Sequence, residues 1–120
     1  MAKKIMIIDD EQHMLFLSKA ILASSGYEVV TESDSTKAFN TAKEQKPDLI
    51  LMDLVMPNIN GVELAKQIEE DSELKDAHIF AFTGTPDVIG EQNSKYFEKI
   101  LLKPFQTEDL IKEINNFFNK

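Results

Sequence analysis

The sequence predicts an α/β fold in which a five-stranded parallel sheet carries helices on both faces. Two observations support this prediction. Short apolar runs of strand length alternate with segments whose apolar residues recur at helical spacing. Polar residues follow directly after four of these runs, and open α/β sheets build their sites at the carboxyl ends of their strands. The pattern therefore predicts both the architecture and the edge of the sheet that bears the functional groups.

The five predicted strands are short and bulky, as strands buried on both faces of a parallel sheet are. In chain order they cover Ile5–Ile8, Tyr27–Thr31, Asp48–Met52, His78–Phe82 and Lys99–Leu102. Parallel neighbours need long crossovers, and the intervening segments are long enough to contain helices.

Start and stop signals delimit the first two helices. Apolar residues recur at helical spacing over Met14–Ile21, and Gly26 then supplies a left-handed stop. The second helix can be capped by Asp34 or Ser35 and must end before Pro47.

The remaining helices follow the third, fourth and fifth strands. The third helix starts after the loop at Asn60-Gly61. A fourth helix can start at Pro86, although Gly90 lies in its interior and few apolar residues follow. A last helix starts at Thr107, with acidic residues in its first turn.

Right-handed crossovers leave few topologies for such a chain. The flavodoxin-like strand order 2-1-3-4-5 makes strands 1 and 3 neighbours across the switch point. That order brings Asp9, Asp10 and Asp53 together and places Thr83 and Lys103 on the far side of Asp53.

Length and composition restrict the class of protein. The 120 residues contain no linker, repeat or low-complexity tract, so we expect one domain over residues 1–120. The chain lacks cysteine, a signal segment and any membrane-length apolar run, so we expect a cytoplasmic protein without membrane contact. The net charge is −8 and all 13 basic residues are lysines, which argues against direct nucleic-acid binding.

The grouped side chains suit phosphoryl chemistry. Three carboxylates in one pocket repel one another unless a cation is present, and Mg²⁺ prefers such oxygen ligands. An ammonium from Lys103 and a hydroxyl from Thr83 complete a site for a phosphoryl group. No Ser-His or Cys-His pair is visible, so the apparent nucleophile is a carboxylate, which can form an acyl phosphate.

Each of these residues has a plainer interpretation when taken alone. Asp10 can be a helix cap, Asp53 a turn residue, Thr83 a β-favouring residue and Lys103 a solvated lysine. Their joint placement at neighbouring strand ends favours a common site.

The whole chain resembles the receiver domain of two-component response regulators, including the small chemotaxis-type regulators. Single motifs such as Asp-Asp or Lys-Pro are weak signals, but five motifs occur here in order. They are Ile7–Glu11, Leu49–Pro57 around Asp53, Gly61, Phe82-Thr83-Gly84 and Lys103-Pro104-Phe105.

The resemblance implies a role for each acidic residue. Asp53 matches the aspartate that takes a phosphoryl group from the phosphohistidine of a kinase. Asp10 matches the direct Mg²⁺ ligand, and Asp9 matches its partner, which often acts through water. The backbone carbonyl of Val55 matches the third protein ligand, so the implied metal site comprises Asp9, Asp10, Asp53 and Val55.

The resemblance also implies the parts of a switch. Lys103 matches the lysine that binds a phosphoryl oxygen, and the Lys103-Pro104 peptide matches a bond that is cis in the family. Thr83 matches the hydroxyl that closes on the phosphoryl group. Ile100 departs from the pattern, because receivers usually carry there an aromatic ring that turns inward as the threonine moves.

The resemblance also implies a phosphoryl donor and a downstream target. The implied donor is a histidine kinase or phosphotransfer protein, and the implied target is a downstream protein or output domain. The surface of the fourth helix, fifth strand and fifth helix would change on phosphorylation. Because Ile100 cannot swap a ring, we expect the segment 86–99 to move more than the helix at 107–119.

Three other classes remain as alternatives. A Mg²⁺-dependent aspartyl phosphatase of the haloacid dehalogenase type needs an aspartate two residues after the nucleophile, where this chain has Val55. An FMN binder needs a phosphate loop after the first strand, where this chain is acidic. A pseudo-receiver that only mediates contacts should lack part of the Asp/Lys set. We therefore expect not an enzyme acting on outside substrates but a signalling domain with self-catalysed phosphotransfer and autodephosphorylation.

Overall fold

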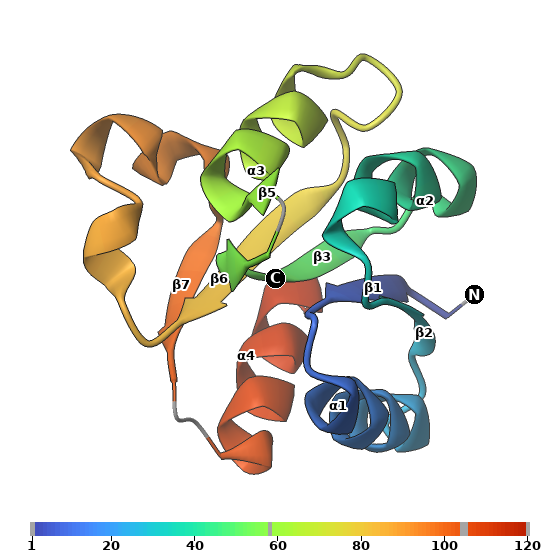
Figure 1. The fold of residues 1–120 in the computed structure, drawn as a ribbon. Helices are drawn as coiled ribbons and strands as arrows, with labels where there is room; N and C mark the ends of the chain where they lie inside the picture. The colour runs from blue at the N-terminus through green and yellow to red at the C-terminus, as the bar shows by residue number, and fades with distance from the viewer. Residues whose placement is uncertain (1, 58, 104–105, 120) are drawn as a thin grey trace.

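The sheet has the predicted strand order. The computed structural model describes residues 2–57, 59–103 and 106–119 (Figure 1). Its parallel strands lie in the order β2-β1-β3-β6-β7, which is 2-1-3-4-5 when the sheet strands are counted along the chain. Their bounds are β1 Lys4–Ile8, β2 Glu28–Glu32, β3 Leu49–Asp53, β6 His78–Thr83 and β7 Lys99–Leu102.

Four α-helices flank this sheet. α1 and α4 pack on one face, and α2 and α3 pack on the other (Figure 1). Their bounds are α1 Gln12–Ser24, α2 Ala38–Gln45, α3 Gly61–Glu70 and α4 Thr107–Phe118. The flavodoxin-like α/β fold predicted from the sequence is thereby confirmed.

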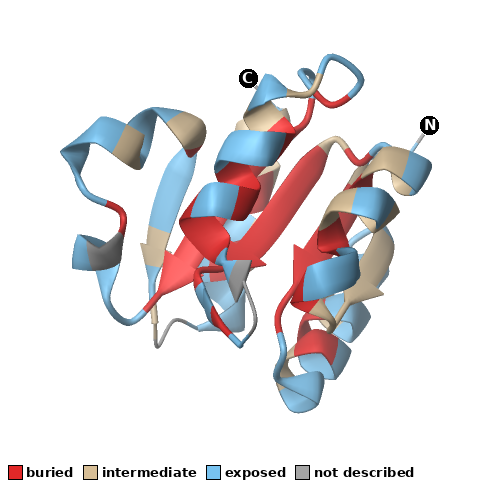
Figure 2. Cartoon of the chain, turned by 45° about the horizontal axis from the view of Figure 1, so that its top comes forward, coloured by how far each residue is buried: buried red, intermediate tan, exposed pale blue. Residues whose placement is uncertain are grey.

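The core consists of two apolar clusters separated by the sheet. Successive side chains of a strand point to opposite faces. Ile5 and Ile7 of β1 therefore pack with α1 and α4, whereas Met6 and Ile8 pack with α2 and α3. All five residues of β3 are buried, and Figure 2 shows the central strands as the buried interior of the molecule. This double burial explains the apolar runs of β1, β3 and β6. The expectation of equal burial is wrong for β7, an edge strand in which Lys99, Ile100 and Leu102 are exposed.

The helices begin and end close to the predicted cap and stop residues. Gly26 follows α1 with a φ of 97°, a backbone conformation that glycine adopts without steric cost. Asp34 accepts a hydrogen bond from the Thr36 N–H, but it caps a 3₁₀ turn, η1 (Ser35–Lys37), rather than α2 itself. Lys46 ends α2 in the left-handed region with a φ of 48°, directly before Pro47.

The fourth crossover differs from a continuous α-helix. It contains two 3₁₀ segments, η2 (Pro86–Val88) and η3 (Glu91–Tyr96), which are separated at Gly90. The φ of Gly90 is 73°, which interrupts a right-handed helix. Ile89 and Phe97 of this segment are buried and pack in the core.

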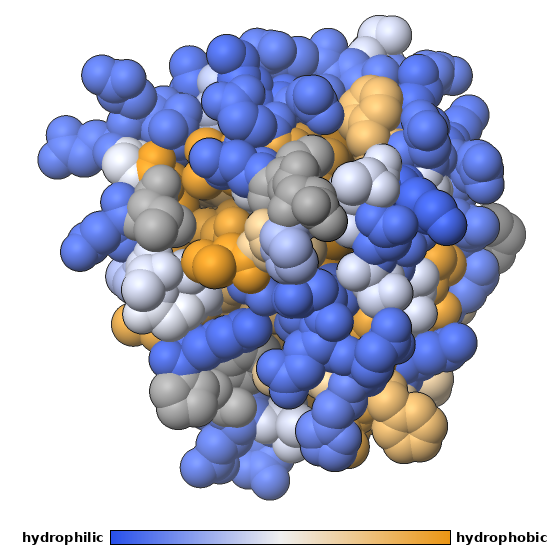
Figure 3. Space-filling view, in the orientation of Figure 1, coloured by the Kyte–Doolittle hydropathy of each residue, from blue (hydrophilic) through white to orange (hydrophobic). Residues whose placement is uncertain are grey.

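A two-stranded antiparallel hairpin lies between β3 and α3 and was not predicted. It pairs β4 (Val55–Met56) with β5 (Ile59–Asn60). The surface seen in Figure 3 is mainly hydrophilic, in keeping with the net charge of −8. Within the described ranges, no helix is long and apolar enough to cross a bilayer.

Candidate functional site

Sheet register brings the predicted carboxylates together. Ile8 of β1 lies opposite Met52 of β3, so the next residues, Asp9 and Asp53, lie at equivalent positions at the carboxyl ends of adjacent strands. Asp10 follows in the loop to α1. Asp9, Asp10 and Asp53 each offer a carboxylate oxygen, and these oxygens lie within 4.8 Å of one another. Asp9 and Asp53 are buried, whereas Asp10 is exposed.

Lys103 faces two of these carboxylates at once. Its Nζ lies 3.6 Å from Asp9 Oδ2 and 3.5 Å from Asp53 Oδ2. The ammonium also lies 4.9 Å from the centre of the Phe82 ring, an arrangement in which the ring face attracts the cation. The backbone places the lysine here because Lys103 N donates to the carbonyl of Thr83 at 3.0 Å, continuing the β6–β7 ladder.

The two carboxylate oxygens of Asp9 differ in their partners. Its Oδ1 accepts the Glu11 N–H at 3.0 Å. Its Oδ2 is buried and accepts no hydrogen bond from the described residues. Burial raises the pKa of Asp9 to about 6, whereas the Glu11 N–H and Lys103 lower it and Asp53 raises it further. A buried oxygen that accepts no hydrogen bond from the described residues and has the Lys103 ammonium nearby, among three carboxylates, fits a hard divalent cation bound through oxygen.

The chain after Asp53 turns sharply, and a hydrogen bond, a strand pairing and a close backbone contact stabilise this turn. Asp53 Oδ1 accepts the Val55 N–H at 3.2 Å. Val55 then pairs with Asn60 across the β4–β5 hairpin, and its side chain is exposed. A Cβ added to Gly61 would lie 2.7 Å from Leu54 Cα, so the backbone of α3 approaches this turn more closely than any other residue type allows.

Thr83 lies at the end of β6, one residue beyond the partner of Asp53 in the sheet. Its side chain is buried, and its hydroxyl accepts the Thr85 N–H at 3.0 Å. The Thr83 and Thr85 hydroxyl oxygens are 3.3 Å apart. The hydroxyl is therefore turned toward Thr85 in this structure, and it lies on the same sheet edge as the carboxylates.

The sequence also singled out Ile100 and the Lys103-Pro104 peptide. Ile100 of β7 is 38% exposed and contributes to a shallow groove of about 340 Å³ along η2 and η3. The branched side chain is thus at the surface, next to the segment predicted to move. Pro104 lies outside the described residues, so the cis Lys103-Pro104 peptide stays a prediction.

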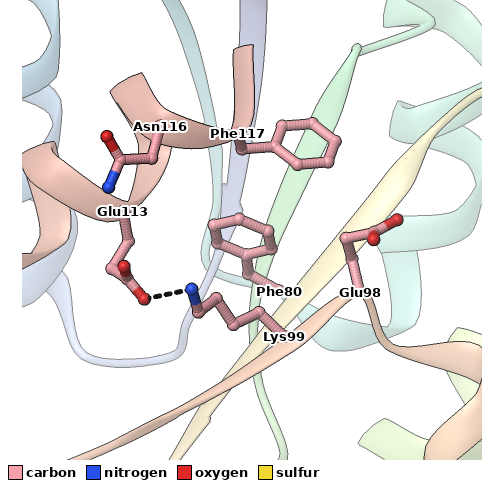
Figure 4. A pocket seen from close by; sticks show the side chains of 6 residues that line it. All are labelled: Phe80, Glu98, Lys99, Glu113, Asn116 and Phe117. Carbon is pink, nitrogen blue, oxygen red and sulfur yellow. Dashed lines mark ion pairs between the residues drawn. The ribbon is translucent and has the colours of Figure 1, made fainter. Parts of the chain in front are cut away.

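A second cavity lies at the opposite, amino-terminal edge of the sheet (Figure 4). Its volume is about 110 Å³, and an ion pair of 2.6 Å between Lys99 Nζ and Glu113 Oε2 joins β7 to α4 beside it. The residues that line it are Phe80, Glu98, Lys99, Glu113, Asn116 and Phe117. This cavity is separate from the carboxylate cluster.

Comparison with known families shows the family of the chain. Residues 5–115 match the model of the response regulator receiver domain. The chain belongs to this family. Response regulators are signalling components of two-component systems, so the family resemblance inferred from the sequence motifs is confirmed.

Individual relatives agree with the family assignment. The polar-differentiation response regulator DivK of Brucella anthropi is 29% identical, over 98% of this chain and 97% of its own. PhoP of Bacillus subtilis, a transcriptional regulator of alkaline phosphatase synthesis, is 41% identical over 70 residues, or 58% of this chain. The matched part is 29% of PhoP and 50% of the DNA-binding regulator MtrA of Mycobacterium tuberculosis, so these relatives are much longer.

Solved structures show the same fold. The chemotaxis response regulator CheY4 of Vibrio cholerae has a TM-score of 0.87 and 28% identity, and the match covers 97% of this chain and 98% of CheY4. TrrA of Thermotoga maritima, solved in complex with Mg²⁺-BeF, has a TM-score of 0.84 and 28% identity, and the match covers 95% of this chain and 97% of TrrA.

Proposed function

We propose that this chain is a phosphoacceptor receiver in which Asp53 takes a phosphoryl group from a histidine kinase or phosphotransfer protein. One observation carries the proposal. Lys103 Nζ lies 3.5 Å from Asp53 and 3.6 Å from Asp9, beside a cluster of three carboxylates. A nucleophilic carboxylate with an ammonium beside it and a cation-binding cluster around it suits phosphoryl transfer.

In this proposal the carboxylates of Asp9, Asp10 and Asp53, together with the backbone carbonyl of Val55, hold Mg²⁺. Two observations support a cation here. The Oδ2 of Asp9 is buried and accepts no hydrogen bond from the described residues, and the structurally similar TrrA was solved in complex with Mg²⁺-BeF. When bound, Mg²⁺ would offset the negative charge of the carboxylates and of the phosphoryl oxygens.

The transfer step uses side chains of this chain. A carboxylate oxygen of Asp53 attacks the phosphorus of the phosphohistidine in line. The phosphorus–nitrogen bond breaks, its electron pair stays on the imidazole nitrogen, and an acyl phosphate forms on Asp53. Lys103 binds a phosphoryl oxygen, and Thr83 turns from Thr85 to donate its hydroxyl to another. Water later attacks the phosphorus, which releases inorganic phosphate and restores the carboxylate.

In this proposal, phosphorylation signals by changing the conformation of a surface that a partner contacts. The turn of Thr83 alters its contacts with Thr85, which precedes η2. The affected surface comprises the segment 86–97, β7 and α4, and it contacts a downstream protein or output domain. Phosphorylation shifts an existing equilibrium because the phosphoryl group binds the two states unequally. We take residues 1–120 as one receiver domain that acts in the cytoplasm without direct nucleic-acid or membrane contact.

Intact-mass measurement after incubation with acetyl phosphate and Mg²⁺ tests this function. We expect the parent protein to gain the mass of one phosphoryl group and Asp53→Asn to gain none, because an amide cannot form the acyl phosphate. Asp76→Asn, an exposed aspartate away from the cluster, is the matched control and should be modified like the parent. An unmodified parent protein, or an adduct that persists in Asp53→Asn, contradicts the assignment.

A further inference from the structure

We propose that Ser35 is a positioning residue for the loop that carries the Val55 carbonyl. The inference rests on the proposed Mg²⁺ site. Ser35 Oγ donates to the carbonyl of Pro57 at 2.7 Å, across 22 residues of sequence. The serine is 5% exposed, so water competes little for this hydrogen bond.

The donor is itself fixed in place. Ser35 opens η1, the 3₁₀ turn of the crossover between β2 and α2. Asp34 Oδ1 accepts both the N–H and the hydroxyl of Thr36, at 2.9 and 2.6 Å. This cap fixes the turn and therefore the direction of the Ser35 side chain. The hydrogen bond thus ties the loop after β3 to a different crossover of the fold.

The tethered carbonyl is close in sequence to the proposed ligand. Pro57 follows β4, and Val55 opens that two-residue strand. Asp53 Oδ1 holds the Val55 N–H, and Asn60 pairs with Val55 across the hairpin. These contacts fix the start and the return of the loop, and Ser35 fixes the point between them. The direction of the Val55 carbonyl depends on all three.

Loss of the Ser35 hydroxyl should therefore weaken the binding of Mg²⁺. The freed Pro57 carbonyl lets the loop adopt further conformers, and only some present the Val55 carbonyl to the cation. The apparent affinity falls by the fraction of molecules that remain competent. A residue that only stabilises the fold would lower the resistance to urea without changing the affinity for Mg²⁺.

The experiment compares three variants with the parent protein by calorimetric titration with MgCl₂ and by urea unfolding without Mg²⁺. Ser35→Ala removes the donor. Ser18→Ala removes another buried serine, which lies on α1, and is the matched control. Ser35→Thr keeps a hydroxyl at the same position. The urea curves establish that each variant is folded during the titration.

We expect Ser35→Ala to weaken Mg²⁺ binding about 3- to 10-fold, the effect of one lost hydrogen bond outside the ligands themselves. Ser18→Ala and Ser35→Thr should bind Mg²⁺ within about twofold of the parent. The positioning role is wrong if the parent protein binds Mg²⁺ and Ser35→Ala binds it equally well. It is also wrong if Ser35→Thr binds Mg²⁺ as weakly as Ser35→Ala. In both cases the proposed function stands. If the parent itself does not bind Mg²⁺, both the function and this inference are wrong.

Discussion

Asp9 shows how the site is built at the scale of a residue. One ammonium, that of Lys103, faces two carboxylates, those of Asp9 and Asp53. Positive and negative charge are therefore unequal within the buried part of the cluster. Burial of a carboxylate without full compensation favours its protonated form, which is why the pKa of Asp9 rises to about 6. A cation and a proton should therefore compete for this side chain.

This competition predicts a pH dependence for Mg²⁺ binding. The folded-state pKa of Asp9 is about 6, above its ordinary value of 3.8. The folded protein therefore takes up this proton as the pH falls through 6, while the unfolded chain does so only near 3.8. Without Mg²⁺, this group thus favours the folded state increasingly on acidification between these values. With Mg²⁺, the same proton must leave before the metal binds.

We expect the dissociation constant for Mg²⁺ to rise about tenfold between pH 7 and pH 5, measured by calorimetric titration at constant ionic strength. Asp9→Asn keeps an oxygen for the Glu11 N–H but cannot titrate, so its weaker binding should vary less over this range. An affinity of the parent protein that is flat from pH 7 to pH 5 would show that Asp9 is already ionised throughout.

Lys103 should stabilise the metal-free protein. Lys103→Gln removes the ammonium from Asp9 and Asp53 and the cation from the Phe82 ring. We expect the free energy of unfolding without Mg²⁺ to fall by about 1–3 kcal/mol, less than for a fully buried pair because the lysine is partly exposed. Urea unfolding measures this change. Lys66→Gln, at an exposed position of α3, is the control, and an equal loss in both variants would contradict the interpretation.

Sequence patterns predicted the strand-end residues but not the contacts that orient them. Asp9, Asp53 and Thr83 follow buried apolar runs, and Lys103 follows the largely exposed apolar run of β7. These placements can be read from the sequence alone. The Ser35–Pro57 hydrogen bond joins residues 22 positions apart through a side chain and a carbonyl. No spacing rule marks such a pair, because its geometry depends on how two crossovers pack.

At the scale of the element, the turn between β3 and α3 depends on a close backbone approach. Gly61 starts α3, where alanine would normally favour the helix. Its added Cβ would meet Leu54 Cα at 2.7 Å and Leu54 O at 2.9 Å. Both atoms belong to backbone, which cannot move aside as a flexible side chain does. The turn that orients Asp53 and Val55 would have to shift instead.

We therefore expect Gly61→Ala to lower the free energy of unfolding by about 1–3 kcal/mol in urea, as overpacking does. The same variant should be phosphorylated more slowly by acetyl phosphate. Gly84→Ala is the matched control for stability, because its Cβ would meet nothing within 4 Å. Equal stability of the two variants would show that the turn adjusts without cost.

The segment 86–97 and α4 differ in how firmly they are attached. Leu110 and Ile114 anchor α4 in the core, and Tyr27 donates a hydrogen bond to Asn115. The segment 86–97 is divided by Gly90, and η3 has no buried residue. The sequence indicated this difference, since few apolar residues follow Pro86, but it did not show that the helix would divide into 3₁₀ turns. The positive φ of Gly90 is what divides the helix, and it is a local backbone conformation.

Amide hydrogen exchange should register this difference on activation. We expect Mg²⁺ with beryllofluoride, a phosphoryl mimic, to change protection in residues 86–99 more than in residues 107–119. Asp53→Asn treated in the same way is the control and should show little change. Equal changes in both segments of the parent protein would contradict the prediction that residues 86–99 respond more strongly than α4.

At the scale of the molecule, the strand order brings residues that are far apart in the sequence to one edge of the sheet. The polar residues at four strand ends meet because β1, β3, β6 and β7 are consecutive in the sheet. Short apolar runs predicted the strands. Right-handed crossovers left few possible topologies, and the flavodoxin-like order chosen among them is the observed one. The β4–β5 hairpin was not predicted, because two-residue strands are too short to show a period.

The whole chain carries a net charge of −8, so any salt should reduce its self-repulsion. Specific Mg²⁺ binding must exceed this general effect. Binding to the folded state alone should raise the free energy of unfolding by about 2.7 kcal/mol when free Mg²⁺ is about 100 times its dissociation constant. We expect urea unfolding in MgCl₂ to show this increase over NaCl of equal ionic strength. Asp10 is exposed and is a proposed ligand, so Asp10→Asn should cost the fold little and respond equally to both salts. If the parent protein also responds equally to both salts, the carboxylates act on stability only through the general charge of the molecule.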